Sequence, residues 1–443
     1  MEIVIKISQL ILSLSILVIV HELGHFFFAK LFKTRVEKFY LFFDPWFSLF
    51  KFKKGETEYG IGWLPLGGYV KISGMIDESM DKEQLKQPPQ PYEFRSKPTW
   101  QRLLIMIGGV VVNFLAAMLI FWFLLYAYGE QYVPVKNATY GLYFDPIAKE
   151  LGLKDGDIVL KVDTFAVDVP IDITRHMLLS DSKTLTVKRA DSTFVLPIPA
   201  GYGKKLLGSG VKNFADIRLP FVVDSVIPNM PAAKAGFQKG DSIISVNGKP
   251  ASFYHQFVIL VNEQKGKAVS VVVQRGGKPV TLTCQVTDKG KVGIGNSSPA
   301  KYFKFKSVTY SFWGALPAGV NKGISVLVNY VKQLKLVFTK EGVTQIGGFG
   351  TMGSLFSPVW DWASFWSLTA LISIVLAFMN ILPIPALDGG HVIFLLYEMI
   401  TGRKPGDKFL ENAQIVGMVI LFSLLIFANG NDIFKGLKHL FGN

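Results

Sequence analysis

Two histidines and a glutamate near the N-terminus have the types and spacing of a metal-dependent hydrolase. His21, Glu22 and His25 form an H-E-x-x-H motif. Residues four apart lie on the same face of a helix, so His21 and His25 can bind one metal ion. Glu22 lies beside them and can take a proton from a metal-bound water. Zinc suits imidazole ligands, and a catalytic zinc commonly has three protein ligands and one water.

The third ligand has to come from elsewhere in the chain, and Asp388 is the leading candidate. It closes the segment Asn380-Ile-Leu-Pro-Ile-Pro-Ala-Leu-Asp-Gly-Gly-His391, in which Pro383 and Pro385 interrupt an apolar helix. Broken backbone at membrane depth is tolerated where it is buried in protein or lines a cavity. His391 is a rival ligand, although a supporting position fits it better. Two interpretations need no metal: Asp388 caps a helix end, or the histidines and Glu22 bond only to neighbouring helices.

Four long apolar segments must position these side chains. They cover residues 7–29, 103–129, 362–387 and 412–431, and a membrane-spanning helix needs about 20 mostly apolar residues. Half of the 443 residues are hydrophobic and only 18% are charged, against about 25% in soluble proteins. This composition excludes a purely soluble enzyme. The single cysteine, Cys284, excludes an intrachain disulfide and a cysteine-based metal cage.

The excess of basic residues predicts how the segments cross the membrane. The formal net charge is +14, and Lys and Arg crowd the 30–102 connection. Short loops rich in Lys and Arg stay in the cytoplasm. We therefore expect a cytoplasmic 30–102 connection, an N-terminus and a 130–361 stretch outside, and a metal site facing the cytoplasm. A nucleic-acid binder would instead gather these cations, with aromatic residues between them, on one face; no nucleic-acid partner is expected.

The long outer stretch contains an internal repeat. Residues 148–163 and 232–247 share the same order: a short helix, a glycine, a Gly-Asp turn at Gly156 or Gly240, and an apolar strand. This pattern resembles bacterial PDZ domains, and the second copy is the closer match. PDZ domains accept an extended peptide along a sheet edge, so exported peptides are possible partners here. The alternative is a rigid spacer or size filter without a ligand.

The histidine motif and the Asp388 segment together resemble the site-2 protease family of intramembrane zinc metalloproteases. The resemblance covers nearly the whole chain, including PDZ-like domains between the second and third helices. It implies Zn²⁺ on His21, His25 and Asp388, with Glu22 as general base and Asn380 in support. It also implies a multi-pass protein of the bacterial inner membrane that cleaves membrane-spanning substrates. Expected substrates are anti-sigma factor-like proteins and, further, signal peptide remnants, in regulated intramembrane proteolysis linked to stress responses.

One further segment fits substrate handling. Residues 61–73 predict a hairpin that turns at Gly67 and Gly68 and continues at Tyr69. The family resemblance implies that this is a β-loop dipping into the lipid bilayer. A sheet edge near the metal could pair with an unwound substrate. We therefore expect substrate contacts at Gly67, Gly68 and Tyr69, and at Asn380, Pro383 and Pro385. The alternative is an ordinary cytoplasmic hairpin.

The sequence as a whole predicts a polytopic α-helical membrane protein. It would have four transmembrane helices, two inserted PDZ-like α+β domains and a membrane-associated β-hairpin. The predicted segments are helix 1 (1–30), the β-hairpin loop (31–101), helix 2 (102–129), two PDZ-like domains (130–220 and 221–300), an amphipathic membrane-surface region (301–361), helix 3 (362–391), a cytoplasmic loop (392–411), helix 4 (412–431) and a tail (432–443). Residues 320–338 are expected to be an amphipathic helix, and 347–353 a flexible lead-in to helix 3.

The predicted function is that of a zinc metalloendopeptidase. A competing hypothesis is a non-catalytic membrane scaffold or chaperone whose PDZ-like pair binds exported peptides. A third is a transporter with a metal or proton site at mid-depth, which predicts inverted repeats among the helices. The scaffold hypothesis predicts no stoichiometric metal, so the zinc content of the purified chain separates it from the protease.

Overall fold

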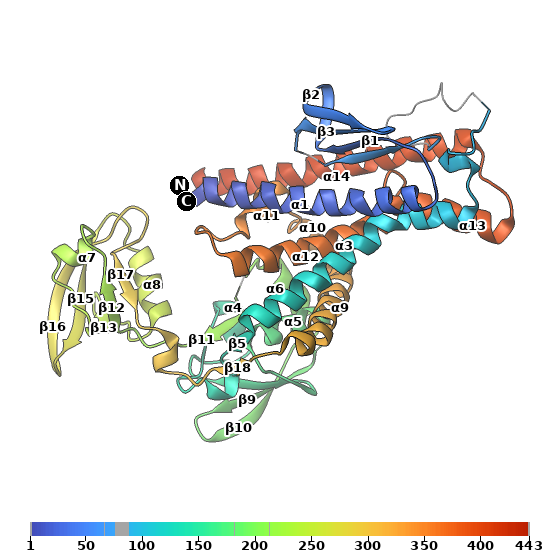
Figure 1. Cartoon of the computed structure of the whole chain (residues 1–443). Coiled ribbons are helices and arrows are strands. Elements are labelled where there is room, and N and C mark those ends of the chain that lie inside the picture. Colours follow the sequence, from blue (N-terminus) through green and yellow to red (C-terminus); the bar gives the residue numbers. More distant parts are fainter. Residues whose placement is uncertain (1, 66, 76–87, 181, 212, 442–443) are drawn as a thin grey trace. The chain divides into compact units, whose positions relative to one another are not determined.

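The protein is described by a computed structural model that covers residues 2–65, 67–75, 88–180, 182–211 and 213–441. The chain divides into two compact units. One unit combines residues 1–129 with 309–443 and carries the long helices. The other unit, residues 130–308, is built from short strands and helices. Figure 1 shows both units coloured along the sequence.

The helical unit holds the apolar segments. Its helices are α1 (Glu2–Leu31), α3 (Thr99–Tyr128), α9 (Phe312–Val337), α10 (Lys340–Val343), α11 (Phe349–Ser354), α12 (Trp362–Asn380), α13 (Asp388–Thr401) and α14 (Asp407–Phe441). In the described part of the chain, four helices are long and apolar enough to cross a membrane: α1, α3, α12 and α14. Helix α3 packs against α1, α9, α12 and α13, so it lies at the centre of this unit.

The third apolar segment departs from its predicted course. Helix α12 ends at Asn380, several residues before the predicted end at 387. The chain then turns through Pro383 and Pro385, which cannot donate backbone hydrogen bonds to a continuing helix. A new helix, α13, begins at Asp388 and runs to Thr401. The prediction that 392–411 is a loop is therefore wrong for its first half, because an apolar face of α13 packs against α3.

Two predictions for the region before α12 have different outcomes. Residues 320–338 were expected to be helical, and α9 covers this stretch up to Val337, starting earlier at Phe312. Its position at a membrane surface stays a prediction. The glycine-rich residues 347–353 were predicted to be a flexible lead-in to helix 3, but most of them belong to α11. Asp432 of α14 accepts hydrogen bonds from the backbone N–H groups of Gly348 and Thr351, which holds this segment in place.

A four-stranded sheet follows α1. Its strands are β1 (Val36–Leu41), β2 (Phe43–Lys54), β3 (Thr57–Leu64) and β4 (Tyr69–Ile72), in the spatial order β2-β3-β1-β4. The predicted hairpin over 61–73 is wrong, since β3 and β4 do not pair with each other. Strand β1 lies between them, parallel to β3 and antiparallel to β4. The adjacent antiparallel pair is instead β2 with β3, and β4 is left as an edge strand.

The second unit contains two modules with the same plan. Module 1 comprises β6 (Leu142–Phe144), α4 (Pro146–Lys149), β7 (Ile158–Val162), β8 (Phe165–Ala166), α5 (Pro170–Leu179), β9 (Thr184–Arg189), β10 (Ser192–Pro197), α6 (Tyr202–Gly208) and β11 (Ala215–Ile217). Module 2 comprises β12 (Val223–Val226), α7 (Pro231–Lys234), β13 (Ser242–Val246), β14 (Lys249–Pro250), α8 (Tyr254–Asn262), β15 (Ala268–Arg275), β16 (Lys278–Gln285) and β17 (Ile294–Asn296). Strands β5 (Glu130–Tyr132) and β18 (Lys306–Val308) pair where the chain enters and leaves the unit.

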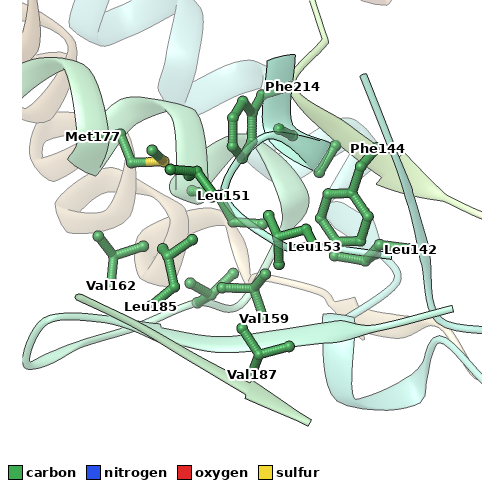
Figure 2. Packing of buried hydrophobic residues seen from close by; sticks show 14 of the residues in the cluster. Leu142, Phe144, Leu151, Leu153, Val159, Val162, Met177, Leu185, Val187 and Phe214 are labelled. Carbon is green, nitrogen blue, oxygen red and sulfur yellow. The ribbon is translucent and has the colours of Figure 1, made fainter. Parts of the chain in front are cut away.

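Each module has its own hydrophobic core. Read in the same direction, the sheets have the matching orders β10-β9-β7-β8 and β16-β15-β13-β14. In module 1 the buried side chains include Leu151, Met177 and Phe214, which Figure 2 shows packed in one cluster with sheet residues such as Val159 and Val187. Module 2 has a separate cluster of buried residues. The repeated stretches seen in the sequence therefore correspond to two α+β domains with separate cores.

Candidate metal centre

Three side chains from distant parts of the chain converge in the helical unit. The Nε2 atoms of His21 and His25 lie 3.2 Å apart. The Oδ2 atom of Asp388 lies 3.1 Å from His21 Nε2 and 3.4 Å from His25 Nε2. Among the described residues, these three form the group of histidine and carboxylate side chains that could hold a metal ion. Helix α1 supplies both histidines, one turn apart, and the first residue of α13 supplies the carboxylate.

The arrangement fits a zinc ion. Ligand atoms about 2.0–2.2 Å from a tetrahedral ion lie roughly 3.3–3.6 Å from one another, close to the three separations found here. Asp388 Oδ2 receives no hydrogen bond from the described residues, although it is buried. Such an orphaned oxygen facing two imidazole nitrogens is unfavourable without a positive charge between them. A cation at this point would remove the conflict.

The start of α13 is folded tightly against the turn that precedes it. A Cβ atom on Gly389 would lie 2.2 Å from the carbonyl oxygen of Leu382, so only glycine fits there. The backbone at Ala386 has φ of 76°, a conformation that ordinary residues rarely adopt. This compact turn brings Asp388 close to the histidines. Pro383 and Pro385 end α12, and Gly389 lets the chain fold back against the turn at the start of α13.

Glu22 lies between the ligand histidines and the sheet. It follows His21 directly on α1 and is partly buried. The position of a Cβ on Gly68 would be 2.6 Å from Val18 Cγ1 and 3.6 Å from Glu22 Cγ. Because Gly68 has no side chain, the backbone just before β4 can pack closely against α1 beside Glu22. The edge strand of the sheet is thus placed beside the metal centre.

The other predicted substrate contacts in this segment have structural partners. Gly67 lies against the ring of Phe43. The Tyr69 ring stacks between Tyr40 and Phe43, and its hydroxyl donates to Asp44 Oδ1 at 2.8 Å. Burial, together with the Asp44 carboxylate, raises the pKa of the Tyr69 phenol. The Tyr69 side chain is therefore held within the sheet.

The residues of the broken helix fall into two groups. Asn380, at the end of α12, places its Nδ2 3.2 Å from His21 Nε2, so it lies at the metal centre itself. Pro383 and Pro385 lie in the turn, and Pro385 contacts α14 at Gly417. His391 is not part of the three-residue group. It lines a cavity of about 100 Å³ together with Arg102 and Glu398.

Helix α3 contributes contacts to the histidines that the sequence motifs do not indicate. Asn113 Nδ2 lies 3.3 Å from Nδ1 of His21, and the Ile105 carbonyl oxygen lies 2.8 Å from Nδ1 of His25. A Cβ on Gly109 would lie 2.5 Å from His25 Nε2. The sequence did contain one signal: Asn113 is the only amide side chain in the uncharged segment 103–129.

Comparison with known proteins agrees with this geometry. The model of peptidase family M50 matches residues 9–424. The regulator of sigma-E protease RseP of Escherichia coli is 30% identical over 456 residues, covering 96% of this chain and 98% of that protein. A Vibrio cholerae protein named "Putative zinc metalloprotease" is 29% identical over 453 residues, covering 95% and 97%. A Treponema pallidum protein of the same name is 26% identical, covering 97% and 99%.

Proposed function

The chain belongs to peptidase family M50 and is a zinc metalloprotease, and we propose that it hydrolyses peptide bonds within the transmembrane segments of membrane-anchored proteins. The observation that carries this proposal is the convergence of His21, His25 and Asp388 in a unit whose long helices are apolar enough to span a membrane. A protease whose metal centre lies among such helices meets its substrates within the bilayer.

In this proposal His21, His25 and Asp388 hold the zinc ion. Bound there, zinc supplies a polarised carbonyl and a water of lowered pKa. Glu22 adjoins the ligands and takes the proton of the attacking water, then gives it to the leaving nitrogen. Asn380 offers an amide donor at the same point and helps orient the scissile carbonyl. Pro383 and Pro385 keep the neighbouring backbone non-helical.

The edge strand β4 is proposed to hold the substrate. A helix cannot be cut while its carbonyl groups are engaged in its own hydrogen bonds, so the substrate must be unwound and held extended. Strand β4 pairs with β1 on one side only, and Gly68 sets its start beside Glu22. An extended substrate can pair with the free edge through main-chain hydrogen bonds. This places a peptide bond next to the general base.

Location and partners follow from charge distribution and from the relatives. The basic 30–102 connection supports a cytoplasmic position for the sheet, with residues 130–308 on the outer side of a bacterial inner membrane. The name of the Escherichia coli relative refers to a sigma factor, which supports anti-sigma factor-like substrates in regulated intramembrane proteolysis. Module 2 is proposed to bind the exposed ends of exported or trimmed peptides. Module 1 has Phe214 where module 2 has Gly293, directly before the last strand of each module.

Substitution Glu22→Gln tests the proposed base. The variant should keep zinc close to one ion per chain, because glutamine leaves the three ligands in place. It should cut a reconstituted single-span substrate about 10²- to 10⁴-fold more slowly. Zinc is measured by elemental analysis, and cleavage by gel shift in liposomes. His21→Ala is the matched control and should lose the metal. Normal turnover by Glu22→Gln contradicts the assignment of the base, and purified protein that holds no stoichiometric zinc and cuts no substrate supports the scaffold or chaperone hypothesis.

A further inference from the structure

We propose that Asn113 is a positioning residue that keeps the Nδ1 proton on His21, so that the Nε2 lone pair of this histidine faces the metal. The inference rests on the proposed ligand role of His21. An imidazole ligand binds a metal through one nitrogen while the other, protonated, needs an acceptor. The hydrogen-bond partner of Nδ1 therefore decides whether His21 is ready to bind.

The two orientations of the Asn113 amide differ in whether its oxygen has a hydrogen-bond partner. The side chain is fully buried, with Nδ2 3.3 Å from His21 Nδ1 and with Oδ1 lacking any partner among the described residues. If Nδ2 donates to Nδ1, the proton of His21 is forced onto Nε2, which then cannot bind a metal. A half-turn of the amide exchanges two atoms of nearly equal shape. Oδ1 then accepts the Nδ1 proton, and the orphaned oxygen gains its hydrogen bond.

His25 provides a reference for this arrangement within the same site. Its Nδ1 lies 2.8 Å from the Ile105 carbonyl oxygen. A carbonyl oxygen can only accept, so Nδ1 of His25 carries the proton and Nε2 is free to face Asp388. Asn113 with its oxygen toward His21 has the same effect on the second histidine. Both imidazoles then present Nε2 lone pairs to one point.

One face of α3 carries both acceptors. Ile105, Gly109 and Asn113 follow one another at intervals of four residues, so they line the same side of the helix. Between the two acceptors, a Cβ on Gly109 would lie 2.5 Å from His25 Nε2 and 2.6 Å from His21 Cε1. The glycine thus leaves room for the imidazoles to approach. On α12, Ser373 Oγ donates to the Asn113 carbonyl oxygen at 2.7 Å, which fixes the helix at this level.

Polar residues in membrane helices also serve simply as contacts between helices, and the experiment separates that role from positioning. Zinc affinity of the full-length protein in detergent is measured by competition with a chelator. Asn113→Leu removes the acceptor and should weaken zinc binding about 10- to 100-fold. Asn113→Asp keeps an acceptor and cannot donate when ionised, so it should bind zinc within a few-fold of the unchanged protein.

The control is Thr369→Val, which removes a buried hydrogen bond between α12 and α1, to Ser13, away from the histidines. It should leave zinc affinity unchanged, although it costs a contact between helices. Two results would overturn the inference: unchanged zinc affinity in folded Asn113→Leu, or affinity in Asn113→Asp as weak as in Asn113→Leu. His21→Ala separates the metal-ligand role of His21 from the positioning role of Asn113. If that variant keeps zinc, the ligand assignment fails. If it loses zinc while Asn113→Leu does not, only the role of Asn113 fails.

Discussion

Modules 1 and 2 share one ion pair with a buried aspartate but differ in the connection before the last strand of each domain. In module 1, Arg189 donates to both Asp157 oxygens and to the Gly152 carbonyl oxygen. In module 2, Arg275 makes the same three contacts with Asp241 and Gly236. Both aspartates are about 1% exposed. The repeat has therefore kept the residues that join the short helix, the turn and the sheet.

The difference lies in the connection before the last strand. Module 1 uses residues 198–214 for this connection. They form α6, which contacts α5, and end at the fully buried Phe214. Module 2 uses the shorter stretch 286–293, which ends at Gly293 with φ of 91°. The strand pairs β6–β11 and β12–β17 place Phe214 and Gly293 at matching positions. The same fold therefore carries an extra helix and a buried phenylalanine in module 1, and a short connection ending in glycine in module 2.

The largest predicted effect comes from truncating Phe214, which lies in the core of module 1. Phe214→Ala should cost about 3–5 kcal/mol, because truncation of a buried aromatic leaves a cavity. Hydrogen exchange of the full-length protein should show lost protection in α5, α6 and β11. Peptides from module 2 should be unaffected and serve as the internal control. If Phe214→Ala left module 1 as well protected as module 2, Phe214 would not be important for the stability of module 1.

The shared ion pair gives the next largest effect, with a defined pH dependence. Burial raises the pKa of Asp241, but hydrogen bonds from Arg275 and the Gln238 N–H outweigh it, so its pKa lies below the ordinary value. A carboxyl group with a depressed folded pKa stabilises the folded state above its unfolded pKa, about 3.9. This stability is lost as pH falls through the folded pKa.

Asp241→Asn should therefore destabilise module 2 by about 1–3 kcal/mol at neutral pH, because it weakens hydrogen bonds to a buried group while Arg275 stays solvated. The unchanged module should lose protection below about pH 4, and the variant should show a weaker dependence in that range. The measurement is exchange of α8 and β15, corrected for the intrinsic rate at each pH. Asp157→Asn is the matched variant and should act on module 1 alone. Loss of protection in both modules from one substitution would contradict separate cores.

The smallest effect concerns peptide binding. The backbone N–H groups of Val292 and Gly293 donate to no acceptor among the described residues, which suits a peptide carboxylate. A peptide with a free apolar C-terminus should protect β17 and α8 from exchange, and its amidated form should bind about tenfold more weakly, equal to about 1.4 kcal/mol. No protection should occur in α5 or β11. Binding that ignores amidation would argue against carboxylate recognition.

Much of the helical unit was predictable because the relevant signals are local. Uninterrupted apolar runs indicated the four long helices, and prolines marked the end of α12. The repeat predicted two domains because the same turn residues recur. The end of the third segment was mispredicted, since α13 is apolar along one face only. Its burial depends on contact with α3, which no local pattern reveals.

The sheet shows where sequence patterns are insufficient. Residues 61–73 carry two strand-like runs and a Gly-Gly pair, which is typical of a hairpin. Strand pairing is decided by all neighbours, and β1 from earlier in the chain lies between β3 and β4. Gly68 thus makes a close approach to α1 rather than a tight turn.

By itself, the sequence determined the chemical types: two histidines one helical turn apart, an adjacent glutamate, and an aspartate after a proline-broken helix. Helical periodicity alone puts His21 and His25 on one face, whatever surrounds them. Only the tertiary structure decided that Asp388 reaches them, that β4 passes over Glu22, and that Asn113 meets His21. Those contacts join segments separated by tens to hundreds of residues, and their geometry is set by helix packing, which a linear pattern does not encode.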